Sequence, residues 1–135
     1  MSWWGDLVGA PFEDGGRGPV SFDCWGLVRH VYAKQLGLFL PDHDGVAVRQ
    51  TREIARRMDG GGSDGLFRQV AAPRALDVAL MTAAAGSQVA GHVGVMVDET
   101  RVLHIWRGTD ACVMRLSDYR LRGRVLGFYR HVQRP

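Results

Sequence analysis

Lysine is almost missing from this chain of 135 residues: Lys34 is the only one, and arginine supplies nearly all of the positive charge. The chain also lacks a long apolar run, because no stretch approaches the roughly 18 uninterrupted apolar residues that a membrane span needs. Its start, MSWWGDLVGAPF, has no basic residues followed by an apolar segment. We therefore expect a soluble product that is made in the cytoplasm without a signal peptide.

Cysteine is scarce as well, since Cys24 and Cys112 are the only two. Two cysteines so far apart are too few for a disulfide framework, and we expect free thiols. The chain has no C-x-x-C pair of the kind that many zinc sites contain. The sequence therefore predicts no metal and no other cofactor, and a Cys/His/His zinc site remains the weaker alternative.

Length and composition fit one compact domain over residues 1–135, because 46% of the residues are hydrophobic. The net charge is +3. The C-terminal segment from Arg115 to Arg134 contains six arginines and only one acidic residue, Asp118. Such a segment could bind an anionic polymer, but neither a recognition helix nor interleaved aromatic residues accompany it. The pattern favours solvated arginines over nucleic-acid binding.

The segment from Cys24 to Gly37 has the pattern of an amphipathic helix. Its apolar residues recur at helical spacing, Asp23 can cap the first turn, and Gly37 supplies a stop. The cysteine thus falls in the first turn, where unpaired N–H groups and the helix dipole favour a thiolate. This placement suits a reactive thiol, and a buried structural cysteine is the alternative.

A second, more polar helix is predicted over residues 46–58, followed by a glycine-rich loop from Gly60 to Gly65. From Leu66 onward, short β-branched or aromatic runs alternate with turns. The five predicted strands are Asp77–Met81, His92–Val97, Val102–Trp106, Cys112–Leu116 and Val125–Val132. Helices first and an antiparallel meander afterwards predict an α+β domain.

Two histidines, His92 and His104, fall on neighbouring predicted strands. If the DETR turn pairs Val97 with Arg101, Gly94 lies opposite His104, and His92 lies diagonal to His104 on the same face. A register shifted by one residue would separate the two imidazoles. In the predicted register they could serve a nucleophilic cysteine as its base and the group that orients the base. The alternative is a pair of structural histidines.

The stretches FDCWGLV, DVALM and GHVGVMVDETRVLHIW resemble the NlpC-type cysteine peptidases, papain-like enzymes that cut the peptide stems of bacterial peptidoglycan. This resemblance implies a papain-like fold, with the nucleophile at a helix start packed on an antiparallel sheet of about five strands. It implies Cys24 as nucleophile, His92 as general base and His104 as the residue that orients His92. The implied oxyanion and substrate-binding positions are Phe12, Asp23 and Trp25.

Three positions depart from the usual pattern of that family. Trp25 stands where serine commonly follows the cysteine, and Leu76 stands where glycine commonly precedes the aspartate of the first strand. Phe12 takes the place of a tyrosine whose hydroxyl helps to form the oxyanion site. Phenylalanine cannot donate a hydrogen bond, and the loss of one such donor can lower the rate by roughly 10²–10³.

The short format, with PFEDGGRGPVSFDCWGLVRHVY leading into the helix, resembles the versions that tailed phages and gene transfer agents encode. The resemblance implies a place in the tail tip beside other tail and hub proteins, and delivery by the particle to the periplasm and cell wall. The implied reaction is hydrolysis of the γ-D-glutamyl to diamino acid bond. The alternative is a structural tail-tip component that uses the same fold for protein interaction.

Overall fold

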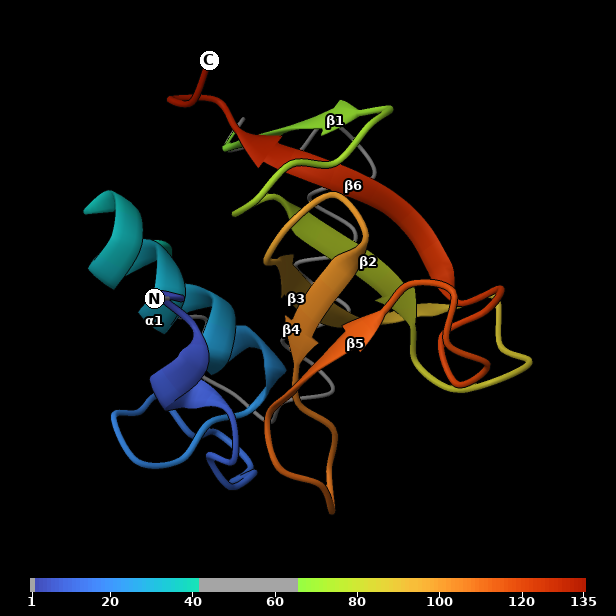
Figure 1. Cartoon of the computed structure of the whole chain (residues 1–135), viewed down its shortest axis with the longest axis horizontal. Helices are drawn as coiled ribbons and strands as arrows, with labels where there is room; N and C mark the ends of the chain where they lie inside the picture. The colour runs from blue at the N-terminus through green and yellow to red at the C-terminus, as the bar shows by residue number, and fades with distance from the viewer. Residues whose placement is uncertain (1, 42–65) are drawn as a thin grey trace.

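The computed structural model describes residues 2–41 and 66–135. This part contains a short 3-10 helix, η1 (Gly5–Leu7), one α-helix, α1 (Cys24–Leu36), and six strands. The strands are β1 (Phe67–Val70), β2 (Val78–Thr82), β3 (Ala90–Met96), β4 (Arg101–His104), β5 (Cys112–Arg115) and β6 (Val125–His131). They form one antiparallel sheet in the order β1-β6-β2-β3-β4-β5, with α1 on one side (Figure 1). The predicted α+β class is confirmed, with six strands in place of about five.

The helix that begins at Cys24 matches the sequence prediction at both ends. Asp23 is its N-cap, and one carboxylate oxygen accepts a hydrogen bond of 2.6 Å from the backbone N–H of Gly26. Gly37 ends the helix in the left-handed conformation at φ 64°, which glycine adopts without steric cost. The second predicted helix, over residues 46–58, and the loop from Gly60 to Gly65 lie outside the described residues.

All five predicted strands are present, but three details of the predicted sheet were wrong. The order is not a simple meander, because β6 returns to lie between β1 and β2. Strand β1 was missed, since only its two end residues are even partly buried and it has no alternating pattern. Strand β4 ends at His104, two residues early, because Trp106 enters a turn in which its carbonyl accepts from the Thr109 N–H.

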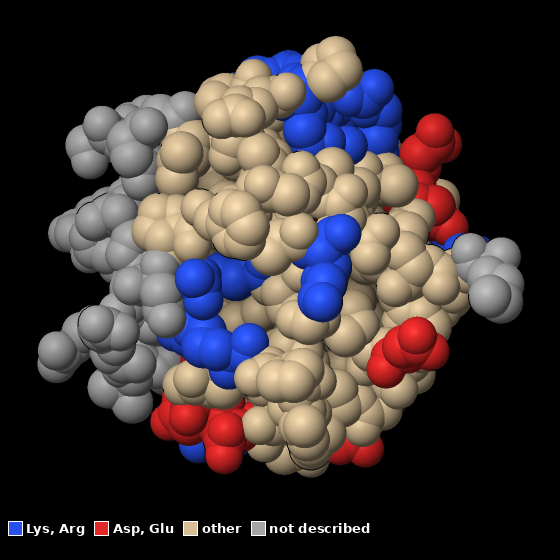
Figure 2. All heavy atoms as spheres, turned by 90° about the vertical axis from the view of Figure 1, so that its left-hand side faces the viewer, with Lys and Arg blue, Asp and Glu red and all other residues tan. Residues whose placement is uncertain are grey.

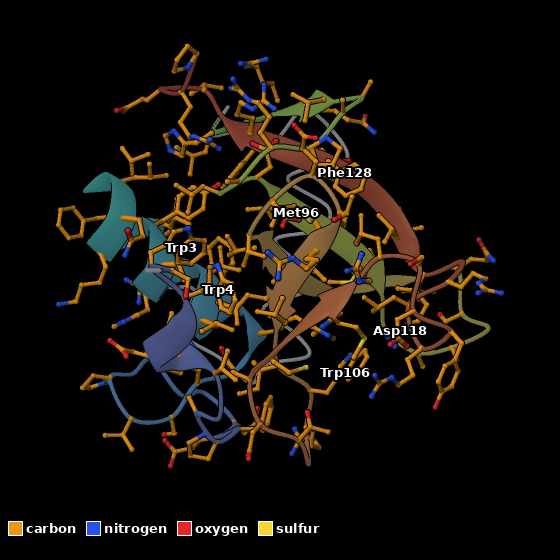
Figure 3. All side chains as sticks on the ribbon, viewed as in Figure 1. Trp3, Trp4, Met96, Trp106, Asp118 and Phe128 are labelled. Atoms are coloured by element: carbon orange, nitrogen blue, oxygen red, sulfur yellow. The ribbon has the colours of Figure 1, made fainter. Side chains whose placement is uncertain are left out.

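The sheet is buried on both faces, and every residue of β2 is buried. One hydrophobic cluster joins α1 residues such as Leu27 and Val31 to alternate sheet residues, and a second cluster contains Met81 and Met96. Burial on both faces explains why β2 reads as a continuous apolar run in the sequence. The N-terminal Trp3 and Trp4, labelled in Figure 3, pack against the first cluster and are partly buried.

The C-terminal arginines are not all solvated, as the sequence pattern had suggested. Arg130 donates two hydrogen bonds, of 2.8 and 2.7 Å, to the two carboxylate oxygens of Asp77, and Arg134 donates a third of 2.8 Å. Asp77 is fully buried at the start of β2. On the face shown in Figure 2, basic side chains form separate groups, not one continuous stripe. Arg130 and Arg134 therefore stabilise the fold by pairing with a buried carboxylate.

Leu76, one of the departures from the usual pattern, has a backbone conformation that glycine would adopt more readily. Leu76 has a positive φ of 74°, the left-handed region in which glycine is favoured. Its backbone N–H donates to the carbonyl of Met96, and its carbonyl accepts from the hydroxyl of Tyr32. The two bonds hold Leu76 in this conformation. A glycine here would adopt it without the steric cost of a Cβ.

Candidate active site

The start of α1 is held in place by the loop that precedes it. The carboxylate of Asp23 is fully buried and pairs with Arg17 at 2.8 Å, while its second oxygen caps Gly26. The helix also approaches the loop backbone closely, because a Cβ on Gly26 would lie 1.9 Å from the carbonyl oxygen of Gly16. Only glycine fits this approach. These contacts fix the position of Cys24, the first residue of α1.

The two histidines lie side by side in the predicted register. Val95 pairs with Leu103, and the N–H of Val97 donates to the carbonyl of Arg101, so the register of the DETR hairpin is confirmed. His92 Nε2 lies 3.0 Å from His104 Nδ1, and both side chains are buried. This pair is therefore hydrogen-bonded through one defined nitrogen of each ring.

Gly94 gives the histidine pair its space. A Cβ at this position would lie 2.7 Å from Val102 Cγ2, 2.9 Å from the carbonyl oxygen of Leu103 and 3.0 Å from His104 Cβ. Real Cβ atoms essentially never approach other atoms so closely, so a larger residue would push β4 away from β3. The absence of a side chain on Gly94 thus lets the strand that carries His104 lie close to the strand that carries His92.

Trp106 and Arg124 pack beside the histidine pair. The Trp106 ring stacks on His92 with ring centres 5.6 Å apart and meets the edge of His104 at 4.2 Å. Arg124 places its guanidinium carbon 5.2 Å from the centre of the Trp106 ring and donates to the carbonyl oxygen of Thr82 at 2.8 Å. The imidazoles therefore lie in a buried, aromatic environment beside a buried cation.

This environment keeps both histidines neutral. Burial and the charge of Arg124 lower the pKa of His104 from 6.5 to about 4. Burial, together with His104 and Arg124, lowers the pKa of His92 well below 6.5. Neutral imidazole can accept a proton, so His92 has the protonation state that a general base requires.

The lowered values predict how stability depends on pH. In the unfolded chain these histidines titrate near pH 6.5, so acid protonates the unfolded state first. The contribution of the neutral histidines to the free energy of unfolding is complete above about pH 6.5 and is lost as the pH falls toward 4. We expect the free energy of unfolding, measured with urea, to decline over this window and to decline less in His104→Gln. Equal slopes in the two proteins would contradict the prediction.

A cleft of about 740 Å³ brings Cys24 and His92 together, while His104 lies behind His92 and does not line it. Cys24, His92 and Phe12 all line it, and the rest of the lining includes Trp106 and Arg124. Trp106 lies at the same end of the molecule as Asp118 in Figure 3. The cleft therefore joins the start of α1 to the β3–β4 hairpin, which are distant in the sequence.

Two of the residues that the resemblance implied for substrate binding, Asp23 and Trp25, do not line the cleft. Asp23 and Trp25 are 0% and 2% exposed. Asp23 caps α1, and Trp25 packs in the core and donates from its indole nitrogen to the carbonyl of Pro41 at 2.9 Å. Their side chains support the helix start. Phe12 does line the cleft, with the guanidinium carbon of Arg107 5.4 Å from the centre of its ring.

Sequence reasoning missed two residues beside the histidines. Cys112 lies opposite His104 on β5, with its sulfur 3.9 Å from His104 Nε2. Arg124 comes from the segment just before β6 and reaches the same region. The pairing of Cys112 with His104 follows from the β4–β5 register, which the sequence left open. No local pattern marks Arg124 as different from the other C-terminal arginines.

Within residues 2–41 and 66–135, no three His, Cys, Asp or Glu side chains gather closely enough to hold a metal ion. Within the same residues, no helix combines the length and the apolar character that crossing a membrane requires.

The sequence profile of the NlpC/P60 family matches residues 9–119, most of the chain. The chain belongs to the NlpC/P60 family. The match includes both the segment that begins α1 and the β3–β4 hairpin, so it covers Cys24, His92 and His104. Among curated proteins, no match to this NlpC/P60 chain was found.

Solved structures of other NlpC/P60 proteins share the fold. An NLP/P60-family protein described as similar to a lipoprotein, from Staphylococcus aureus, is 22% identical with a TM-score of 0.63 over 93% of this chain. The NlpC/p60 domain of the peptidoglycan hydrolase SagA is 21% identical, with a TM-score of 0.58 over 92% of this chain and 88% of that domain. NlpC2 from Trichomonas vaginalis is 16% identical, with a TM-score of 0.59 over 93% of this chain. This chain spans 37% of the staphylococcal protein and 44% of NlpC2.

Proposed function

We propose that the chain is a cysteine peptidase that hydrolyses peptide bonds in the stems of peptidoglycan. The observation that carries this proposal is that Cys24 and His92 line the same cleft, with His92 Nε2 3.0 Å from His104 Nδ1. Membership of the NlpC/P60 family supports a cysteine peptidase in general terms, and one structure of the same fold is a domain of a peptidoglycan hydrolase.

The proposed reaction proceeds through a thioester on Cys24. His92 takes the proton of the thiol, and the thiolate attacks the carbonyl carbon of the scissile bond. The backbone N–H of Cys24, at the start of α1, stabilises the oxyanion. His92 then gives its proton to the leaving amine, and water hydrolyses the thioester with His92 again as base.

His104 determines which nitrogen of His92 faces the nucleophile. When His92 becomes an imidazolium, both of its nitrogens carry protons, so His104 Nδ1 must accept from His92 Nε2. Neutral His104 then carries its own proton on Nε2, which lies 3.9 Å from the sulfur of Cys112. Burial raises the pKa of Cys112 and keeps this thiol uncharged. Cys112 thus acts as a positioning residue that accepts from His104.

Replacing Cys112 should therefore slow the reaction without weakening substrate binding, because Cys112 does not line the cleft. The loss of one weak acceptor is worth about 1 kcal/mol, or about a fivefold lower kcat, in Cys112→Ala. Cys112→Ser keeps an acceptor and should restore most of the rate. Steady-state kinetics measure both. An unchanged kcat in Cys112→Ala, or an equal loss in the two variants, would contradict this role.

We extend the proposal to the bond and the biological setting that the sequence resemblance implies. The scissile bond is the γ-D-glutamyl to diamino acid linkage, and residues 1–135 act as one domain at the tail tip of a phage-like particle, beside other tail or hub proteins. The support is the resemblance of the segment from Pro11 to Tyr32 to phage and gene-transfer-agent versions. A structural tail-tip component is the second candidate, which Phe12 favours because its ring brings no hydroxyl into the cleft.

Digestion of purified diaminopimelate-type peptidoglycan tests the activity, with the released muropeptides measured by mass. We expect stems severed between D-glutamate and the diamino acid. A cut at another stem bond would support the peptidase activity but contradict the proposed γ-D-glutamyl to diamino acid specificity. No cut by the folded protein would favour the structural component. Mass spectrometry of purified phage-like particles tests the tail-tip position, and absence of the chain from them would overturn it.

A further inference from the structure

The cleft is strongly basic. Its lining contains four arginines, Arg107, Arg120, Arg122 and Arg124, and neither aspartate nor glutamate. Two of the four have carboxylate partners beside the cleft. Arg107 pairs with Asp14 at 3.0 Å, and Arg120 pairs with Asp118 at 2.9 Å.

For the other two arginines, the acceptors in the described part of the chain are neutral. Arg124 donates to the carbonyl oxygen of Thr82 at 2.8 Å and to its hydroxyl at 3.3 Å. Arg122, which is exposed at the rim, donates to the carbonyl of Ser117 at 3.4 Å. Within the described residues, neither guanidinium lies in an ion pair.

Arg124 is buried, so the lack of an anionic partner among the described residues is unusual. The residue is 8% exposed, and burial lowers its pKa from the ordinary value for arginine. Buried charges in proteins are normally paired, because removing a charge from water is costly. Arg124 lines the cleft and also lowers the pKa of both His92 and His104. Among the described residues, no carboxylate pairs with this charge beside the two histidines.

We propose that Arg122 and Arg124 bind a carboxylate group of the stem peptide. This inference rests on the proposed function, since the stem is then the ligand. The arginine side chain suits it, because a planar guanidinium matches the geometry of a carboxylate. Gly123, at a positive φ of 78°, separates the two residues, and both line the cleft. A bound carboxylate would also offset the charge that opposes protonation of His92.

Calorimetric binding to Cys24→Ala protein tests the carboxylate site without turnover. The probes are L-alanyl-γ-D-glutamyl-diaminopimelate and versions in which one carboxylate at a time is amidated. We expect amidation of the recognised carboxylate to weaken binding at least tenfold. Adding Arg122→Gln should remove most of this selectivity, and the fold should survive because Arg122 is exposed.

The matched control is Arg115→Gln, which makes the same charge change at an exposed residue of β5 that does not line the cleft. This control should leave unchanged the ratio of the affinities for the acid peptide and the amidated peptide. Equal binding of acid and amide peptides, or an equal effect of the two arginine substitutions, would overturn the carboxylate site. Hydrolysis by the wild type separates the two proposals. If the wild type cleaves the stem but acid and amide peptides bind equally, the peptidase proposal stands and the carboxylate site is overturned. If binding favours the acid peptide but no cleavage occurs, the carboxylate site stands and the peptidase proposal is overturned.

Discussion

Cys24→Ala is expected to abolish hydrolysis of stem peptides and to leave the fold unchanged. Without the sulfur no thioester forms, and removal of a catalytic nucleophile typically costs on the order of 10⁶ in kcat. The fold should survive because alanine is smaller, suits a helix, and leaves the Asp23 cap of α1 in place. A residual rate on the order of 10⁶ below that of the wild type would match the proposed mechanism.

The experiment compares muropeptide release by wild type, Cys24→Ala and Cys112→Ala. Circular dichroism and thermal unfolding check that each protein is folded. Cys112→Ala is the matched control, since it removes the only other thiol of the chain and should keep about a fifth of the activity. Substantial cleavage by folded Cys24→Ala would exclude Cys24 as the nucleophile. An equal loss in the two variants would show that thiol loss in general, not Cys24, is responsible.

Asp77→Ala should cause the largest loss of stability. Asp77 is fully buried and receives charged hydrogen bonds from Arg130 and Arg134. Burial acts to raise the pKa of Asp77. Hydrogen bonds from the Arg130 side chain and the Arg74 backbone, together with the charges of Arg130 and Arg134, lower this pKa overall. Removing one partner of a buried pair leaves the other charge uncompensated, at a cost of about 3 kcal/mol.

A loss of that size should lower the midpoint of thermal unfolding by roughly 10 °C for a domain of this length. The control is Asp14→Asn, because Asp14 pairs with Arg107 at the surface, where their side chains are 35% and 65% exposed. Surface pairs contribute about 0–1 kcal/mol. Similar midpoints for Asp77→Ala and wild type would show that the C-terminal arginines do not stabilise β2 through Asp77.

Local features of the site could be predicted because they depend on neighbouring residues. The bounds of α1 follow from a cap at Asp23 and a stop at Gly37, and the hairpin register follows from a short turn. Once the register is known, the two-residue period of strands places His92 and His104 on one face. Their 3.0 Å contact is therefore a consequence of local geometry.

Contacts between distant segments could not be predicted in the same way. Nothing near Asp77 in the sequence identifies Arg130 and Arg134 as its partners, because strand β6 pairs with β2 only in the folded chain. For the same reason, the strand order differs from a meander. The Asp77 pairs therefore became visible only once the sheet was assembled.

The sequence by itself determined the α+β class, the helix start at Cys24, the histidine register and the family resemblance, because each depends on residues close together in the chain. Only the tertiary structure decided which side chains share the cleft. It brought Arg124 beside the histidines, placed Cys112 against His104, and moved Trp25 into the core. The physical reason is that burial and pairing of charges depend on long-range packing, which a single sequence does not specify.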